Sequence, residues 1–190
     1  LSPLIYLLEA MTNLFKKGER KIGTEEQIRS LVSIGRRAGH IESDEGQLIH
    51  RAFILNDKKA GDIMTPLKDI VGVPIDATAR DAAQKVFHNT YSRYPVFGKS
   101  IHDVQGIVMS QDILEALAEG KDEEKVQNIM REALVIKAST HSDGLLATFR
   151  DKHIHLAIVQ DSGKTVGLVT LEDVLEELVG EIEDETDVED

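Results

Sequence analysis

Thr170 and Asp173 stand three residues apart, where an apolar segment gives way to a helical pattern. A carboxylate accepts two hydrogen bonds at once, which suits a pair of neighbouring hydroxyl groups. A threonine hydroxyl and the free N–H groups at a helix start can donate hydrogen bonds to phosphate oxygens. The same two side chains can instead form a capping box, in which each satisfies a backbone N–H group of the other residue. The two residues alone leave both interpretations open.

His153 and His155 are two positions apart, so on a strand they would share a face and could hold a metal ion. A third ligand is not evident, and a packing or phosphate-facing role is the preferred interpretation. The acidic run that ends the chain could collect Mg²⁺ weakly, but such a run is usually a solvated end. The sequence contains no Walker loop, dinucleotide glycine fingerprint or His-Glu-x-x-His helix. Nothing pairs a nucleophile with a base, so we expect neither a catalytic site nor a metal site.

The elements that carry these residues belong to an internal repeat. The first copy contains GDIMTPLKDIVGVPIDATARDAAQKVF, SRYPVF and GIVMSQDIL, and the second contains QNIMREALVIKASTHSDGLLATF, HLAIVQ and GLVTLEDVL. The offset between the copies falls along the chain, which indicates shorter loops in the second copy. The aligned segments are 63–64 with 129–130 (offset 66), 94–97 with 156–159 (offset 62) and 106–114 with 167–175 (offset 61).

Each copy is predicted to have the order β-α-β-β-α. A short apolar strand is followed by an amphipathic helix, capped near Thr78 in one copy and near Ser142 in the other. Two further strands and a closing helix complete the copy, and residues 161–164 form a hairpin turn. The predicted strands are 70–73, 95–97 and 104–108 in the first copy and 134–136, 156–159 and 166–169 in the second. This order predicts an α+β fold with helices packed on small sheets.

The region before the repeats is predicted to be helical. Thr24 and Gln27 form a capping box for a helix that ends near Gly39, and a second helix begins around Ser43. Residues 1–21 place apolar side chains at helical spacing before a basic cluster, so they could lie at a membrane interface or pack on a neighbouring helix. The basic residues follow the apolar ones and the chain begins at Leu1, which predicts a fragment of a longer protein rather than a secretory signal.

Composition narrows the possible classes of protein. With 41% apolar residues, the chain can bury one sizeable core or two small ones. Cysteine is absent, which excludes disulfides, thiolate metal sites and cysteine nucleophiles. The net charge is −12 at pH 7 and its acidic excess lies after residue 61, so nucleic acid is not an expected partner. No apolar stretch approaches the roughly 20 residues that span a bilayer.

Three segments together resemble paired CBS domains (a Bateman module): DIMTP at 62–66, SRYPV at 92–96 and GLVTLED at 167–173. TEEQIRSLV before the pair and EDVLEELVGEIEDE after it resemble the cytosolic part of the CorC/CNNM family of magnesium and cobalt transport proteins. In that family a membrane domain precedes this region, and LSPLIYLLEAMTNLF resembles the juxtamembrane segment that ends it. The resemblance covers residues 1–185.

The resemblance implies a flat, usually dimeric disc that binds ATP or AMP in a cleft between the repeats. Thr170 and Asp173 match the family's Thr-x-x-Asp nucleotide motif, so the carboxylate would bind the ribose hydroxyls. Arg93 matches a phosphate-contacting position, to which its fork of donors is suited. Alternatively Arg93 is a solvated turn residue and Tyr94 a core residue. The other implied nucleotide-binding residues are Thr65 and Pro66 on the adenine side, Ser92 beside Arg93, and Tyr94 and Pro95 flanking the base.

The first copy departs from this motif. Met109 occupies the position of Thr170, and Ser110, Gln111 and Asp112 follow it. A methionine side chain forms no strong hydrogen bond to ribose or phosphate. We therefore expect one nucleotide per chain, with Ser110 serving only as a helix cap.

These observations define our sequence-based interpretation. The expected domains are residues 1–60 (juxtamembrane-like and helical), 61–120 (first CBS repeat), 121–182 (second CBS repeat) and 183–190 (acidic tail). The chain would be the regulatory region, on the cytoplasmic side of the membrane, of a CorC/CNNM-like transport protein. It would bind ATP or AMP, with or without Mg²⁺, as a homodimer that acts on its own membrane domain. The alternative is a soluble CBS-domain ligand sensor without a transporter.

Overall fold

The computed structural model describes residues 23–180, and the chain divides into two compact units, residues 1–50 and 51–190. In the first unit, α2 spans Glu25–Arg37, and α3 (Ser43–Asp57) begins there and ends in the second unit. The predicted capping box of α2 is confirmed, because the N–H of Gln27 donates to Thr24 Oγ1 (3.3 Å) and the N–H of Thr24 to Gln27 Oε1 (3.3 Å). The segment 1–21 and the tail 183–190 lie outside the described residues.

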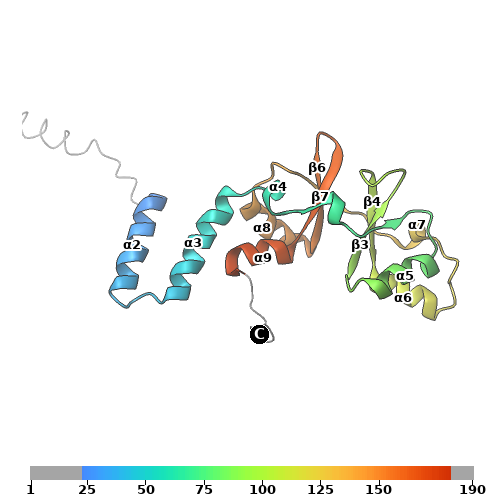
Figure 1. Cartoon of the computed structure of the whole chain (residues 1–190), viewed down its shortest axis with the longest axis horizontal. Coiled ribbons are helices and arrows are strands. Elements are labelled where there is room, and N and C mark those ends of the chain that lie inside the picture. The colour runs from blue at the N-terminus through green and yellow to red at the C-terminus, as the bar shows by residue number, and fades with distance from the viewer. Residues whose placement is uncertain (1–22, 181–190) are drawn as a thin grey trace, which may run out of the picture. The chain divides into compact units, whose positions relative to one another are not determined.

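The second unit contains both predicted β-α-β-β-α copies, so the α+β fold is confirmed (Figure 1). Its first copy consists of α4 (Ala60–Ile63), β1 (Thr65–Pro66), the 3₁₀ turn η1 (Leu67–Asp69), β2 (Val73–Pro74), α5 (Ala79–His88), β3 (Arg93–Phe97), β4 (Val104–Met109) and α6 (Ser110–Ala118). Its second copy consists of α7 (Val126–Ile129), β5 (Leu134–Lys137), α8 (Ser142–Lys152), β6 (Leu156–Asp161), β7 (Lys164–Thr170) and α9 (Leu171–Val179). Among residues 23–180, no helix combines the length and apolar character that crossing a bilayer requires.

Each copy contributes its lead-in segment (residues 60–66 or 126–131) to the other copy. β1 pairs antiparallel with β7 in the sheet β1-β7-β6-β5, with Thr65 opposite Leu168. At the equivalent position, Arg131 forms an antiparallel bridge to Ile107 of β4, beside the sheet β2-β3-β4. The helices follow the same exchange, since α4 packs into the core of the second copy and α7 into that of the first (Figure 1). Two segments distant in sequence therefore join the repeats.

A glycine on each receiving strand permits this close approach. A Cβ added at Gly167 would lie 2.6 Å from the carbonyl oxygen of Thr65, and one at Gly106 would lie 2.6 Å from that of Arg131. Both distances are shorter than a carbon–oxygen contact allows. The glycine that opens each GIVMSQDIL-type segment is thus required by the exchange.

Strand register corrects two sequence-based predictions. Arg93 pairs with Met109 and Leu156 pairs with Thr170, so β3 and β6 are equivalent at an offset of 63 rather than 62. The predicted strand 70–73 is also wrong, because η1 turns the chain and β2 contains only Val73 and Pro74, paired parallel with β3. Since side chains alternate between faces, a slip of one residue exchanges buried and exposed positions.

Two predicted helix caps also require correction. The N-cap of α8 is His141, and Ser142 is its first helical residue, with a buried hydroxyl that has no recorded partner among the described residues. The N-cap of α6 is Met109, while the Ser110 hydroxyl points back to the carbonyl of Ser92 (3.4 Å). By contrast, the predicted cap at Thr78 is confirmed, because its hydroxyl accepts from the N–H of Asp81 (3.1 Å).

The pairing of β1 with β7 gives a direct stability test. Gly167→Ala forces Thr65 away from β7 and should lower the free energy of unfolding by about 1–3 kcal/mol. The control is Gly144→Ala on α8, where an added Cβ meets nothing within 4 Å and should stabilise the helix by about 0.5–1 kcal/mol. Thermal denaturation of the two variants should give shifts of opposite sign, and equal shifts would contradict the close contact.

Candidate functional site

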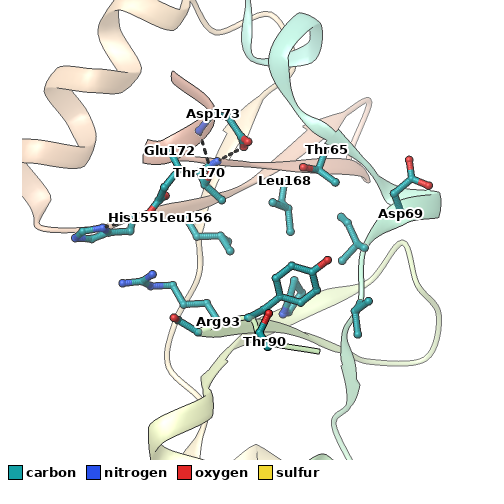
Figure 2. Close-up of a pocket in the computed structure, with 15 residues that line it drawn as sticks. Thr65, Asp69, Thr90, Arg93, His155, Leu156, Leu168, Thr170, Glu172 and Asp173 are labelled. Carbon is teal, nitrogen blue, oxygen red and sulfur yellow. Dashed lines mark hydrogen bonds and ion pairs between the residues drawn. The ribbon is translucent and has the colours of Figure 1, made fainter. Parts of the chain in front are cut away.

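A pocket of 410 Å³ lies between the two copies inside the second unit (Figure 2). The segment after β1, the start of β3, the start of β6 and the junction of β7 with α9 all contribute to it. Its apolar lining comes mainly from Ile70, Val71, Leu156 and Leu168. A volume of this size lies within the range of small-molecule sites in proteins.

Thr170 and Asp173 form a complete capping box on the rim of this pocket. The N–H of Asp173 donates to Thr170 Oγ1 (3.1 Å), and the N–H of Thr170 donates to Asp173 Oδ2 (2.7 Å). Both residues also line the pocket, because β7 ends and α9 begins at its edge. The capping interpretation is confirmed, and it places a half-buried carboxylate and a hydroxyl at the pocket mouth.

The polar side chains of the pocket lie at two ends. Figure 2 shows Arg93 and His155 on one side and Thr65 and Asp69 on the opposite side. His155 Nδ1 lies 4.0 Å from Glu172 Oε1, and the His155 carbonyl accepts from the N–H of Leu171 (3.0 Å), the first residue of α9. These contacts place His155 at the N-terminus of α9, whose dipole favours an anion, and Arg93 lies on the same side of the pocket.

The structure brings most of the predicted site residues together. The pocket-lining members are Thr65, Ser92, Arg93, Pro95, Thr170 and Asp173. Pro66 pairs with Gly167 within the sheet and does not line the pocket.

Tyr94 is a core residue, so the prediction that its ring flanks a ligand needs correction. Its side chain is 0% exposed, its hydroxyl donates to the carbonyl of Asn89, and burial raises the pKa of the Tyr94 phenol. Tyr91, which is 55% exposed, lines the pocket instead and meets the Tyr94 ring edge-on at 6.1 Å. The alternating faces of β3 turn Tyr94 inward.

The paired-histidine metal hypothesis loses its geometric basis. His153 has a left-handed backbone (φ 53°) as the C-cap of α8, and β6 begins only at Leu156, so the two histidines share no strand. In the part of the chain from residue 23 to residue 180, no group of three or more His, Asp or Glu side chains is arranged to hold a metal ion.

Several pocket residues are not predicted by the sequence motifs. They are Asp69, Ile70, Val71, Thr90, Tyr91, Leu156, Leu168 and Glu172, while His155 was noted only as a possible phosphate neighbour. Glu172 lies inside the quoted GLVTLED segment, and Tyr91 immediately precedes the SRYPV segment. Their proximity to those motifs was the available signal, whereas Ile70 and Val71 were hidden by their assignment to a strand.

Comparison with known proteins decides the family. A family model for the CBS domain matches residues 60–119 and 126–180. A solved structure described as the CBS domain of the bacterial CNNM/CorC family Mg²⁺ transporter is 32% identical to this chain, with a TM-score of 0.79. The match covers 86% of this chain and 100% of the solved one. The chain is a pair of CBS domains of the CorC/CNNM family.

Curated relatives of this CBS pair are longer proteins. UPF0053 protein sll1254 of Synechocystis is 38% identical over 98% of this chain and 54% of its own length. The magnesium and cobalt efflux protein CorC of Escherichia coli K12 is 30% identical over 91% of this chain and 59% of its own length. The chain therefore spans about half the length of the curated relatives it matches.

Two further CBS structures carry nucleotides. The bacterial CNNM/CorC CBS domain in complex with ATP is 34% identical, with a TM-score of 0.70, over 73% of this chain and 99% of its own. A CBS pair with bound AMP from Klebsiella pneumoniae is 26% identical, with a TM-score of 0.58, over 65% of this chain and 99% of its own.

The two CBS repeats are chemically unequal at the equivalent positions. In the first repeat the carboxylate of Asp112, the counterpart of Asp173, accepts from the Arg131 guanidinium at 2.9 and 2.8 Å. Met109 replaces Thr170, and Leu156 is the register counterpart of Arg93. The Thr170 hydroxyl therefore has no counterpart in the first repeat, and the Arg93 guanidinium has none in the second.

Proposed function

We propose that this chain is the adenine-nucleotide-binding regulatory region of a CorC/CNNM-like magnesium and cobalt transport protein. The observation that carries the proposal is the pocket between the CBS repeats, where the Thr170–Asp173 pair and Arg93 converge. The names of similar proteins support it, since one relative is a magnesium and cobalt efflux protein and similar CBS structures hold ATP or AMP. The proposed role is binding rather than catalysis.

The distribution of charge suggests how the nucleotide lies. Phosphates would lie toward Arg93, His155 and the N-terminus of α9, because a guanidinium and the positive end of a helix dipole both favour negative charge. The ribose hydroxyls would donate to Asp173, which has one carboxylate oxygen in the cap and can accept further hydrogen bonds. The base would lie among Ile70, Val71 and the exposed ring of Tyr91.

The carboxylate side chains that line the pocket favour a ligand whose negative charge is partly neutralised. Asp69, Glu172 and Asp173 all line the pocket, to which Arg93 contributes a guanidinium. ATP brought in with Mg²⁺ would carry less negative charge into this site than free ATP. In the full-length protein, the CBS pair would lie on the cytoplasmic side of the membrane. It would act on a membrane domain if the nucleotide binds two arrangements of the CBS dimer with unequal affinity.

We expect the chain to be a homodimer. Leu114 on α6 and Leu175 on α9 occupy equivalent positions in the two repeats and are 40% and 41% exposed. Apolar side chains repeated on two equivalent helices suit a symmetric interface. Light scattering should give twice the chain mass of 21.1 kDa, and a monomer at high concentration with and without nucleotide would contradict this.

Calorimetric titration tests the nucleotide proposal. One equivalent of ATP or AMP should bind per chain, measured with and without Mg²⁺, because Met109 and the Arg131–Asp112 pair remove the second site. Two equivalent sites per chain would contradict the stoichiometry. Absence of heat with every adenine nucleotide would contradict the function.

Asp173→Ala separates binding from capping. If Asp173 holds the ribose, the variant loses charge-assisted hydrogen bonds of roughly 1.5–3 kcal/mol each, and affinity should fall at least about tenfold. Loss of the cap should also lower stability by about 1 kcal/mol.

Asp81→Ala is the matched control, because Thr78 and Asp81 form the same capping box outside the pocket. It should lower the melting temperature and leave ATP affinity unchanged. Asp112→Ala removes the counterpart in the first repeat. If that variant loses affinity while Asp173→Ala does not, the site lies on the other side of the repeat pair.

A further inference from the structure

α9 has one end in the pocket and the other end on α3. Thr170 and Asp173 cap its N-terminus, and Glu172 in its first turn lines the pocket. Its C-terminal half is in contact with residues of α3 and of the loop that follows α3. The helix is nine residues long, so its two ends are only about 13 Å apart.

Two cations hold the C-terminal half of α9. Lys58 Nζ lies 2.6 Å from Glu177 Oε2, with the two side chains 34% and 27% exposed. The Arg51 guanidinium donates to the carbonyl of Val179, in the last turn of the helix. α9 has no basic residue of its own in that turn, so Arg51 supplies the positive charge that a helix C-terminus favours.

Gly180 and Leu55 allow α3 to pack closely against the C-terminal end of α9. Gly180 adopts φ 86°, and a Cβ there would collide with the Arg51 guanidinium. Leu55, which is 5% exposed, belongs to the same buried cluster as Val174, with Leu178 packed against it. The carbonyl of Lys58 also accepts from the N–H of Ser142 (3.0 Å), which fixes the end of α3 on α8.

We infer that Lys58 and Arg51 are positioning residues for the nucleotide pocket and act on it through α9. This inference rests on the proposed function, because it concerns how ATP affinity at the same pocket is regulated. A short helix held at both ends moves as one body, so the contacts of Glu177 and Val179 set where Asp173 and Glu172 stand. By linkage, a nucleotide that binds the held position of α9 strengthens the α3–α9 contact by the same factor.

The test is a charge exchange between Lys58 and Glu177, read by calorimetric titration with ATP. Lys58→Glu and Glu177→Lys should each lower the affinity about three- to tenfold, and the double variant should return it to within about twofold. Hydrogen exchange at residues 51–57 should slow on adding ATP in the parent and in the double variant but not in the single variants.

Arg80→Glu is the control, because it breaks an ion pair of Arg80 with Asp122 (3.1 Å) remote from α9. It should leave ATP affinity unchanged whatever its melting temperature. The coupling is wrong if the parent binds ATP and the single variants bind it equally well. It is also wrong if the double variant regains the melting temperature of the parent but not its ATP affinity. In either case the proposed function stands. If the parent does not bind ATP, the proposed function itself fails.

Discussion

The antiparallel pairing of Thr65 and Pro66 with β7, matched by the Arg131–Ile107 bridge, is the contact on which the candidate site depends. It ties the lead-in segment of each repeat to the sheet of the other. Once Thr65 is paired, η1 must turn the chain back toward its own repeat, and Ile70 and Val71 then line the pocket. Gly106 and Gly167 make this exchange of segments possible, because a Cβ at either position would lie 2.6 Å from a backbone carbonyl oxygen of the incoming segment.

The Thr170–Asp173 capping box serves both the fold and the proposed ligand. Each side chain satisfies a backbone N–H that the helix leaves unpaired, so the box by itself holds the start of α9 in place. A ligand that binds there meets groups already oriented, which reduces the entropy cost of binding. The same helix carries Glu177 and Val179 to α3, so one short element links the proposed site to the segment that precedes the repeats.

The two repeats share a backbone arrangement but differ in chemistry. Between the repeats, Met109 is the equivalent of Thr170, Arg131 of Thr65, and Leu156 of Arg93. On the first-repeat side the chain's own guanidinium already occupies the carboxylate of Asp112. An exposed ion pair of this kind contributes little stability, so its main effect is to occupy both oxygens of the Asp112 carboxylate.

The sequence by itself determined the repeat, the β-α-β-β-α order, the caps at Thr24 and Thr78 and the Thr170–Asp173 pair, because these depend on local spacing and on hydrogen bonds within one turn. It also identified Arg93 and Thr65 through motifs. Tertiary structure decided the exchange of lead-in segments and the offset of 63 between β3 and β6. It also decided that Tyr91 lines the pocket and Tyr94 lies in the core. Strand register is fixed by partners far away in the chain, and a slip of one residue reverses which side chains are buried. Local pattern carries no information on that choice, so only the folded chain selects which tyrosine lines the pocket.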